Sequence, residues 1–304
     1  MLLPFDIYSF LLLLSLYFFA LALDFPDLLL LVATDRISAY DVVMAEGVPS
    51  KGWILTALSA YWFDLLRGVT PTHEVEGQPD VAIPQALVGR STLVRRAEMI
   101  PVECVVRGYL AGSGWREYVQ FGSVGGQEVR AGLMLGSELP EILFTPSTKA
   151  AVGHDQPLTL AECIDVVGRE VTMVLRDRSI ELYRLAAQHA RDRGLILADT
   201  KFEFGFIDQE IALCDEVLTP DSSRYWDLAS YVVGREPTQL DKQVLRDWLD
   251  TQRWDRMSAP PHLPDELTRR IMESYRSIYE RLTRRDFNSW PGLDTTYSGR
   301  RESD

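Results

Sequence analysis

The sequence predicts a mixed fold of helices and strands, because apolar and alternating runs typical of strands occur between stretches with helical spacing. Residues Leu28–Ala33 form a short apolar run that is typical of a buried strand. Residues 54–66 have helical apolar spacing and are followed by Gly68, a helix stop signal. Residues 93–106 contain β-branched runs around Pro101, which favours further strands. The first third of the chain is therefore expected to be mixed and rich in strands.

The middle of the chain predicts helices and then a return to strands. Thr159 with Glu162 three positions later forms a capping box, which opens a helix that we expect to run through Val167. A second helix is expected over residues 171–193, ending at Gly194. An apolar strand follows at residues 195–198. Two more helices are expected later, at residues 239–249 and 265–282, with a polar tail from residue 288.

A hairpin is predicted after residue 200. Residues 201–206 alternate phenylalanines with Lys201, Glu203 and Gly205, so one face is expected to be aromatic and buried and the other to carry the chemistry. A turn centred on Gln209 and a returning strand at 211–217 would place Glu203 directly opposite Asp215, with Cβ atoms about 5 Å apart. Two carboxylates this close repel each other unless a cation lies between them.

Composition narrows the class of protein. The 304 residues are 46% hydrophobic and 25% charged, which is the balance of a globular chain with a substantial core. The net charge of −13 opposes the phosphate contacts on which nucleic-acid binding depends, so we expect no nucleic-acid partner. The three widely spaced cysteines form no C-x-x-C pair, which favours buried, reduced thiols and a cytoplasmic protein.

The N-terminus is unusual. Residues 7–23 carry no charge and reach the lower limit of the length that spans a bilayer, about 17 residues. No basic residue precedes Arg36, whereas signal peptides and signal anchors normally begin with Lys or Arg. Three interpretations stay open: a membrane anchor, an interfacial or buried segment, or an aberrant start to the chain. We expect the third, and therefore no membrane partner.

A first candidate site lies in residues 99–113. Glu103 and Arg107 are expected on a strand, and a loop with Gly108, Gly112 and Ser113 follows it. Glycines allow backbone N–H groups to approach a phosphate, and a guanidinium binds oxyanions in a bidentate manner. On composition alone, an ordinary turn after a strand with a solvated arginine is the favoured alternative.

A second candidate site combines residues 199–205, 214–216 and 220–224. These segments place carboxylates, a lysine and an arginine at strand ends and turns, between phenylalanines. A divalent metal with phosphate explains the set economically, since Mg²⁺ takes one or two carboxylates and completes its shell with phosphates and water. A structural salt-bridge network is the alternative.

The motifs in these segments carry a family resemblance. The chain resembles phosphoribosylaminoimidazole-succinocarboxamide synthase, the SAICAR synthetase family, in two specific segments: MIPVECVVRGYLAGS at 99–113 and LADTKFEFG at 197–205. Further matching stretches are ATDRISAYD at 33–41, FTPSTKA at 144–150 with the following His154 and Asp155, and DEVLTPDSSRYW at 215–226. The resemblance covers about residues 28–282.

The resemblance implies an ATP-dependent ligase of purine biosynthesis. It would join the carboxylate of phosphoribosyl-aminoimidazole carboxylate (CAIR) to the amine of L-aspartate, and release SAICAR, ADP and phosphate through an acyl phosphate. The implied fold is α+β, two-lobed and ATP-grasp-like, with an antiparallel-sheet N-terminal lobe, a larger α+β C-terminal lobe and the ATP cleft between them. We accordingly expect an atypical apolar segment at 1–27, a nucleotide-binding lobe at 28–110, a substrate and metal lobe at 111–287 and a polar tail at 288–304.

The resemblance also assigns site residues. Glu203 and Asp215 match the metal ligands, here for Mg²⁺, while Asp199 and Lys201 match catalytic contacts to substrate and phosphate. The matching substrate-binding residues are Arg107, Ser113, Arg224, Lys149 and Asp155. The hinge with Arg96 and Met99 would face the adenine of ATP. Asp35, Arg36 and Ser38 lie in a family-like segment in which a structural role is equally expected.

The chain departs from the family at its start. The family has a Gly-Lys-Val-Arg-Asp-Ile-Tyr segment whose lysine reaches the ATP phosphates, whereas only Asp6, Ile7 and Tyr8 of it are present here, at residues 6–8. Loss of that positive charge predicts weaker phosphate binding. A catalytically impaired or non-catalytic homologue, membrane-anchored or not, is therefore the alternative hypothesis, and the sequence leaves a homo-oligomer open.

Overall fold

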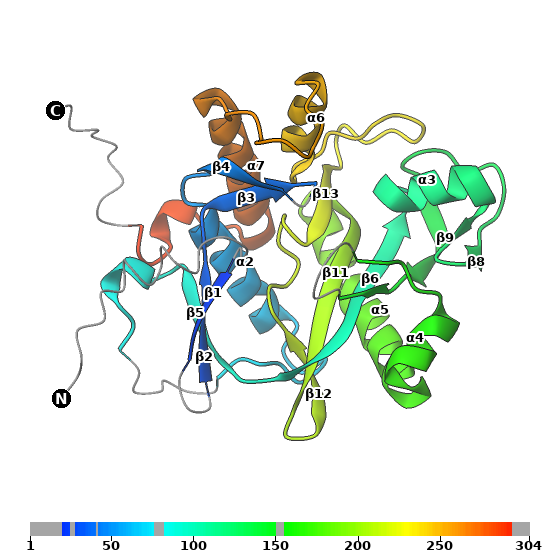
Figure 1. Cartoon of the computed structure of the whole chain (residues 1–304), viewed down its shortest axis with the longest axis horizontal. Coiled ribbons are helices and arrows are strands. Elements are labelled where there is room, and N and C mark those ends of the chain that lie inside the picture. The colour runs from blue at the N-terminus through cyan, green and yellow to red at the C-terminus, as the bar shows by residue number, and fades with distance from the viewer. Residues whose placement is uncertain (1–19, 25–27, 41, 76–81, 150–154, 294–304) are drawn as a thin grey trace.

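The computed structural model describes residues 20–24, 28–40, 42–75, 82–149 and 155–293. Two antiparallel sheets lie side by side, with helices packed against them (Figure 1). The strands of both sheets pair antiparallel, with helices between them along the chain, which confirms the α+β fold that the resemblance implies. Most of the apolar segment at residues 7–23 and the polar tail beyond residue 293 lie outside the described residues.

The smaller sheet is built by the N-terminal part of the chain. Its order is β1-β2-β5, with strands Ala20–Asp24, Leu28–Ala33 and Ser91–Arg95. The strand predicted at Leu28–Ala33 is confirmed, and it pairs on both sides. Helix α2 (Lys51–Leu65) packs on this sheet. It begins three residues before the predicted helix.

The larger sheet is six-stranded and holds the two longest strands, β6 (Glu98–Tyr109) and β11 (Leu195–Ile207), side by side. The two stretches predicted as separate strands at 195–198 and 201–206 form one continuous strand. The sheet is completed by β12 (Glu210–Cys214), β13 (Ser223–Asp227), β9 (Glu138–Phe144) and β10 (Ser147–Thr148). Two small hairpins, β3–β4 (Arg36–Ala39 and Val42–Gly47) and β7–β8 (Ser123–Val124 and Gln127–Glu128), lie outside both sheets.

Short bridges join the two sheets. Thr72 forms a bridge to Leu213 of β12, and Glu74 forms one to Val94 of β5. The backbone N–H of His73 also donates to the carbonyl of Leu213, at 3.0 Å. Residues 72–74 therefore hold the small sheet beside the large one and lie between the two sheets.

Of the remaining α-helices in the described ranges, α4, α5, α6 and α7 were predicted and α3 was not. The capping box at Thr159 opens α4 (Leu160–Val167), and α5 (Arg169–Asp192) ends before Gly194, whose φ of 75° is left-handed. Helix α5 packs on β6 and β11. The others are α3 (Gly112–Phe121), α6 (Gln243–Thr251), α7 (Asp265–Thr283), and the 3₁₀ turns Gln85–Leu87 and Phe287–Ser289. No helix within the described ranges is long and apolar enough to cross a membrane.

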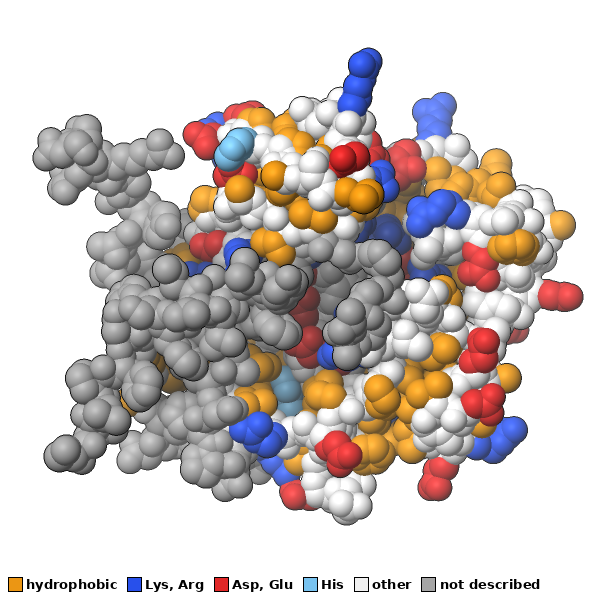
Figure 2. Space-filling model, viewed as in Figure 1, with side chains coloured by type: hydrophobic (Ala, Val, Ile, Leu, Met, Phe, Trp, Pro, Cys, Tyr) orange, Lys and Arg blue, Asp and Glu red, His pale blue; other side chains and the backbone are white. Residues whose placement is uncertain are grey.

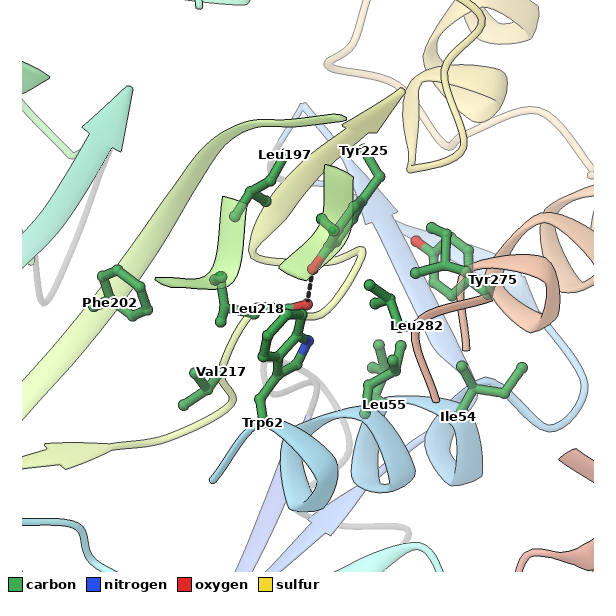
Figure 3. Packing of buried hydrophobic residues seen from close by; sticks show 14 of the residues in the cluster. Ile54, Leu55, Trp62, Leu197, Phe202, Val217, Leu218, Tyr225, Tyr275 and Leu282 are labelled. Carbon is green, nitrogen blue, oxygen red and sulfur yellow. Dashed lines mark hydrogen bonds between the residues drawn. The ribbon is translucent and has the colours of Figure 1, made fainter. Parts of the chain in front are cut away.

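The main core lies between the large sheet, α2 and α7. Trp62 of α2, Tyr225 of β13 and Tyr275 of α7 are essentially buried and point toward one another (Figure 3). The Tyr225 hydroxyl donates to the carbonyl of Leu218 at 2.8 Å, so burial of this polar atom is compensated. This core holds the loop after β12 beside α2, where the Val217 N–H donates to Ser59 Oγ at 3.2 Å, and so positions the site described next.

Candidate active site

Two neighbouring strands display charged side chains on one face of the large sheet. In the β6–β11 pair, Asp199 lies opposite Arg107, and Glu203 lies opposite Glu103, with Lys201 between the two carboxylates of β11. Side chains alternate along a strand, so these residues share a face. Phe202, on the opposite face, is fully buried in the core. The predicted aromatic and chemical faces of this strand are confirmed.

The first group of charges, the arginine–aspartate group, consists of Arg107, Ser113, Asp199 and Arg224. Arg107 donates from Nη1 to Asp199 Oδ2 at 3.1 Å and from Nη2 to Ser113 Oγ at 3.1 Å, and its Nε donates to Thr145 at 3.0 Å. Arg224 Nη1 binds the same Asp199 oxygen. Two guanidinium groups share one carboxylate, so the group keeps a net positive charge and is suited to bind a phosphate.

Gly112 allows this group to assemble. Its φ of 51° is left-handed, and a Cβ atom at this position would lie 2.6 Å from Nη2 of Arg224. Only glycine combines this conformation with such a close approach. The loop predicted from Gly108, Gly112 and Ser113 is mostly regular structure, because Gly108 lies in β6 and Gly112 and Ser113 begin α3; the start of this helix therefore lies directly against Arg224.

The second group, the lysine–carboxylate group, consists of Glu103, Lys149, Lys201 and Glu203. Lys201 Nζ lies 3.1 Å from Glu203 Oε1 and also binds Glu103, while Lys149 binds the other Glu203 oxygen. Burial would raise the pKa of Glu203, but the ammonium groups of Lys201 and Lys149 outweigh it and lower the pKa. For Glu103 burial prevails and raises the pKa. The lysines thus keep Glu203 ionised inside the protein.

The predicted register of the β11–β12 hairpin is wrong by one residue. Glu203 lies opposite Cys214, and Asp215 comes one position after the end of β12. The cause is a two-residue loop at Asp208 and Gln209, both with left-handed φ (50° and 68°), which pairs Ile207 with Glu210. A turn centred on Gln209 would have required an odd-numbered loop.

The carboxylate of Asp215 nevertheless lies near that of Glu203. Its φ of 60° takes it out of the strand, so its side chain does not follow the alternation of β12. Both carboxylates line one cavity, and burial together with the charge of Glu203 raises the pKa of Asp215 to about 6. A cation between them would remove this repulsion, as expected for a metal-binding pair.

The cavity beside the second group has a volume of about 440 Å³. Its apolar end is formed by side chains such as Leu31, Leu55 and Phe63, and its polar end by the lysine–carboxylate group with Asp155, Asp215 and Glu216. His73 lies at the apolar end, 5.2 Å from the Phe63 ring between centroids, and burial lowers the pKa of His73 to about 4. The imidazole is therefore neutral at physiological pH. In Figure 2, acidic and basic side chains lie close together in the middle of the face of the molecule that is shown.

The remaining predicted residues divide between the cavity and the surface. Lys149 and Asp155 line the cavity, whereas Arg96 and Met99 are not among the described residues that line it. Met99 lies at the start of β6, opposite Gly205, and is 39% exposed. The contact of Arg96 and Met99 with adenine stays a prediction.

The family-like segment at 33–41 supports the fold around the site. Asp35 accepts from the backbone N–H of Gly52 at the start of α2, at 2.9 Å, and forms an ion pair of 2.8 Å with Arg90. A carboxylate at a helix N-terminus satisfies a free N–H group and the helix dipole. These contacts account for Asp35 structurally.

No sequence pattern indicated a buried charge cluster that adjoins the arginine–aspartate group. Lys51 is fully buried, and its Nζ lies 2.7 Å from Asp221, which also binds Lys242 at 3.1 Å and accepts from the Tyr275 hydroxyl at 2.7 Å. Nothing local marks Lys51, which is the first residue of the largely apolar helix α2. Glu103 was placed on a strand, but only its register opposite Glu203 shows that it belongs to the site.

The chain is similar in sequence to known proteins of one family. A sequence model of the SAICAR synthetase family matches residues 18–261. Among curated relatives, phosphoribosylaminoimidazole-succinocarboxamide synthase of Thermodesulfovibrio yellowstonii is 44% identical over 86% of this chain and 91% of its own length. The enzyme of that name from Chromobacterium violaceum is 46% identical over 84% of this chain and 92% of its own length.

Solved structures agree with the sequence relatives. SAICAR synthase from Saccharomyces cerevisiae complexed with SAICAR is 40% identical, with a TM-score of 0.79 over 86% of this chain and 91% of the other. A SAICAR synthetase in complex with ADP is 25% identical, with a TM-score of 0.65 over 88% of this chain and 95% of the other. By sequence and by structure, this chain belongs to the SAICAR synthetase family.

Proposed function

We propose that this chain is an ATP-dependent ligase that joins CAIR to L-aspartate and yields SAICAR, ADP and phosphate. The observation that carries the proposal is the single sheet face on which Arg107 and Asp199 lie beside Lys201 and Glu203. The end with Arg107 and Asp199 fits a substrate phosphate, and the end with Lys201 and Glu203 fits a phosphoryl group during its transfer. The names of the sequence relatives and the SAICAR and ADP complexes of the structural relatives support it.

In this proposal the arginine–aspartate group binds the ribonucleotide. Arg107, Ser113 and Arg224 would hold its phosphate by charge-assisted hydrogen bonds, and Asp199 would accept from a hydroxyl group. Arg107 is anchored to Asp199 and Thr145. The guanidinium therefore loses little side-chain entropy when the substrate binds.

The cavity of about 440 Å³ would bind ATP. The base fits the apolar end, where the neutral His73 and Phe63 offer uncharged surfaces, and the phosphates fit the end with Lys149 and Lys201. A carboxylate is a poor acyl donor, so phosphoryl transfer to CAIR would form an acyl phosphate that the aspartate amine attacks. Lys201, held between two glutamates, would neutralise the charge of the transferred group.

The residues present fit a magnesium ion. No cluster of three or more His, Cys, Asp or Glu side chains suited to a metal occurs among the described residues. Mg²⁺ in a nucleotide site needs only one or two carboxylates. Glu203 and Asp215 would hold it, because they line one cavity and repel each other without a cation. Mg²⁺ bound there would screen the charge of the phosphates.

The lobe boundaries and the compartment are part of the proposal. We place the nucleotide-binding lobe at residues 28–110 and the substrate and metal lobe at 111–287, although β6 shares its sheet with β11. We place the protein in the cytoplasm, because Cys104, Cys163 and Cys214 are all free and buried.

One observation favours the alternative of an impaired homologue. Strand β1, which pairs with β2 beside the cavity wall, has the sequence ALALD and carries no lysine or arginine. The family lysine expected near this strand is therefore missing from its described residues. In this alternative the chain folds and binds nucleotide weakly, and turnover is low.

The experiment is ADP release by the purified chain with ATP and Mg²⁺, with complete mixtures compared with mixtures that lack L-aspartate or CAIR. We expect ADP release that requires both, and loss of this activity in Glu203→Ala and in Asp215→Ala, with circular dichroism unchanged. Arg253→Gln, at an exposed residue with no contact to the site, is the matched control. A folded wild-type chain without turnover would favour the impaired homologue, and full turnover in both carboxylate variants would contradict the metal assignment.

A further inference from the structure

Glu103 is a buried carboxylate beside the cavity that binds neither metal nor substrate in the proposed reaction. It belongs to β6, is 8% exposed and lies directly opposite Glu203 of β11. Like charges that face each other across two strands destabilise a sheet, and a buried charge is costly to desolvate. Stability alone therefore gives no reason for a carboxylate at this position, which points to a function.

Both oxygens of the Glu103 carboxylate have a partner. Oε1 binds the ammonium group of Lys201, and Oε2 accepts from Ser147 Oγ at 3.2 Å. Ser147 belongs to β10, which pairs with β6, and it lies directly opposite Glu103. A carboxylate that is bound at both oxygens cannot rotate freely, so Glu103 offers Lys201 an anchor of fixed orientation.

Glu203, the second partner of Lys201, has several tasks. Its Oε1 lies 3.1 Å from Lys201 Nζ, and its Oε2 binds Lys149. In the proposed function Glu203 also holds the magnesium ion with Asp215, so its two oxygens are shared among three cations. Among the described residues, Lys201 is the only cation that forms an ion pair with Glu103. Glu103 is therefore the partner that is reserved for Lys201.

Lys201 needs an anchor because its side chain is flexible and 33% exposed. An ammonium group stabilises a phosphoryl group in transfer only when it lies close to the reacting atoms, and a shift of about 1 Å can lower the rate about 100-fold. We propose that Glu103, oriented by Ser147, is the positioning residue that holds Lys201 at the transferred phosphoryl group. This inference rests on the proposed function, in which Lys201 neutralises the charge of that group.

The test compares kcat with KM in Glu103→Gln, which keeps the size of the side chain and removes its charge. We expect kcat to fall about 10- to 100-fold, while the KM values for ATP, CAIR and L-aspartate stay within about threefold, because the loss arises in the transition state. Ser147→Ala should lower kcat about 2- to 10-fold, the effect of one neutral hydrogen bond. Glu141→Gln, at an exposed position on β9 of the same sheet, is the matched control and should leave kcat unchanged.

A double-mutant cycle tests whether Glu103 acts through Lys201. In a Lys201→Met background, Glu103→Gln should change kcat by less than about twofold, because the lysine that it positions is absent. If Lys201→Met has no measurable turnover, the comparison of kcat with KM in Glu103→Gln and Ser147→Ala decides. The dissociation constant of ATP, measured by calorimetry without CAIR and L-aspartate, should stay within about threefold in Glu103→Gln. Circular dichroism and the Tm verify that each variant is folded.

The outcomes keep the two proposals apart. A wild-type chain that turns over, and a Glu103→Gln variant with an unchanged kcat, would overturn the positioning role and leave the ligase function intact. Losses of kcat that multiply in the double mutant would overturn it as well, because Glu103 would then act independently of Lys201. Large increases in all three KM values, or in the dissociation constant of ATP, would do the same, since they would indicate a general structural role. A folded wild-type chain without turnover would overturn the proposed function, and the positioning role with it.

Discussion

Replacing Lys51 with methionine should destabilise the protein in a pH-dependent manner. Burial would raise the pKa of Asp221, but Lys242 and Lys51 outweigh it and lower the pKa to about 2. Relative to an unperturbed value near 3.8, this shift corresponds to about 2.4 kcal/mol of stability at pH 7, shared among the partners of Asp221. Breaking a buried pair typically costs about 3–5 kcal/mol. Because Lys242 and the Tyr275 hydroxyl stay in place, we expect a loss of about 1–3 kcal/mol for Lys51→Met.

The sign of the pH dependence follows from the lowered pKa. The contribution of Asp221 is fully present above its unfolded pKa near 3.8 and is lost as the pH falls toward about 2. The difference in unfolding free energy between wild type and Lys51→Met should therefore shrink to roughly half by pH 3. Urea denaturation at pH 7 and pH 3, followed by circular dichroism, measures both values.

A double-mutant cycle isolates the pair. In an Asp221→Asn background, Lys51→Met should lower the free energy of unfolding much less, because the carboxylate that Lys51 neutralises is absent. A loss below about 0.5 kcal/mol at pH 7, which is the range of ordinary surface substitutions, would refute the reasoning. So would a loss that is identical at both pH values, since it would arise from packing and not from charge.

Two further substitutions test the starts of α3 and α4. Gly112→Ala should raise the KM for CAIR several-fold, because its Cβ would displace Arg224, and backbone strain should cost about 1–2 kcal/mol. Gly122→Ala, with φ of 70° and open space around the Cβ position, is the matched control and should show the strain without the kinetic effect; equal KM values in both would contradict the role of Gly112. Thr159→Ala should lower stability by about 1 kcal/mol in urea denaturation, because it removes the hydrogen bond of 3.2 Å from the Glu162 N–H, and an unchanged midpoint would argue against the capping box.

Local patterns predicted most of the elements. The strand at Leu28–Ala33, the capping box at Thr159 and the two faces of β11 were all expected from the sequence, because each depends on neighbouring residues along one segment. The register of the β11–β12 hairpin was not predicted correctly. Asp208 and Gln209 both adopt left-handed φ without the glycine that usually marks such a turn, so the sequence carried no signal for a two-residue loop.

The site was predictable as a set of residues and not as an arrangement. Arg107, Asp199 and Glu203 were all singled out from the sequence, but the contact between Arg107 and Asp199 joins positions 92 residues apart. Such a pairing depends on how β6 and β11 align, which no local pattern specifies. Lys51 gave no signal at all, because a buried cation is recognisable only from its surroundings.

The sequence by itself therefore determined the family, the α+β class and the residue types that carry the chemistry. Alternation and capping are properties of one stretch of backbone, and they act before distant segments meet. The tertiary structure alone decided which charges share a face, which are buried together and which are left without a partner. The reason is that electrostatic and packing energies depend on distances through space, and these are fixed only when the sheets and helices close around a common core.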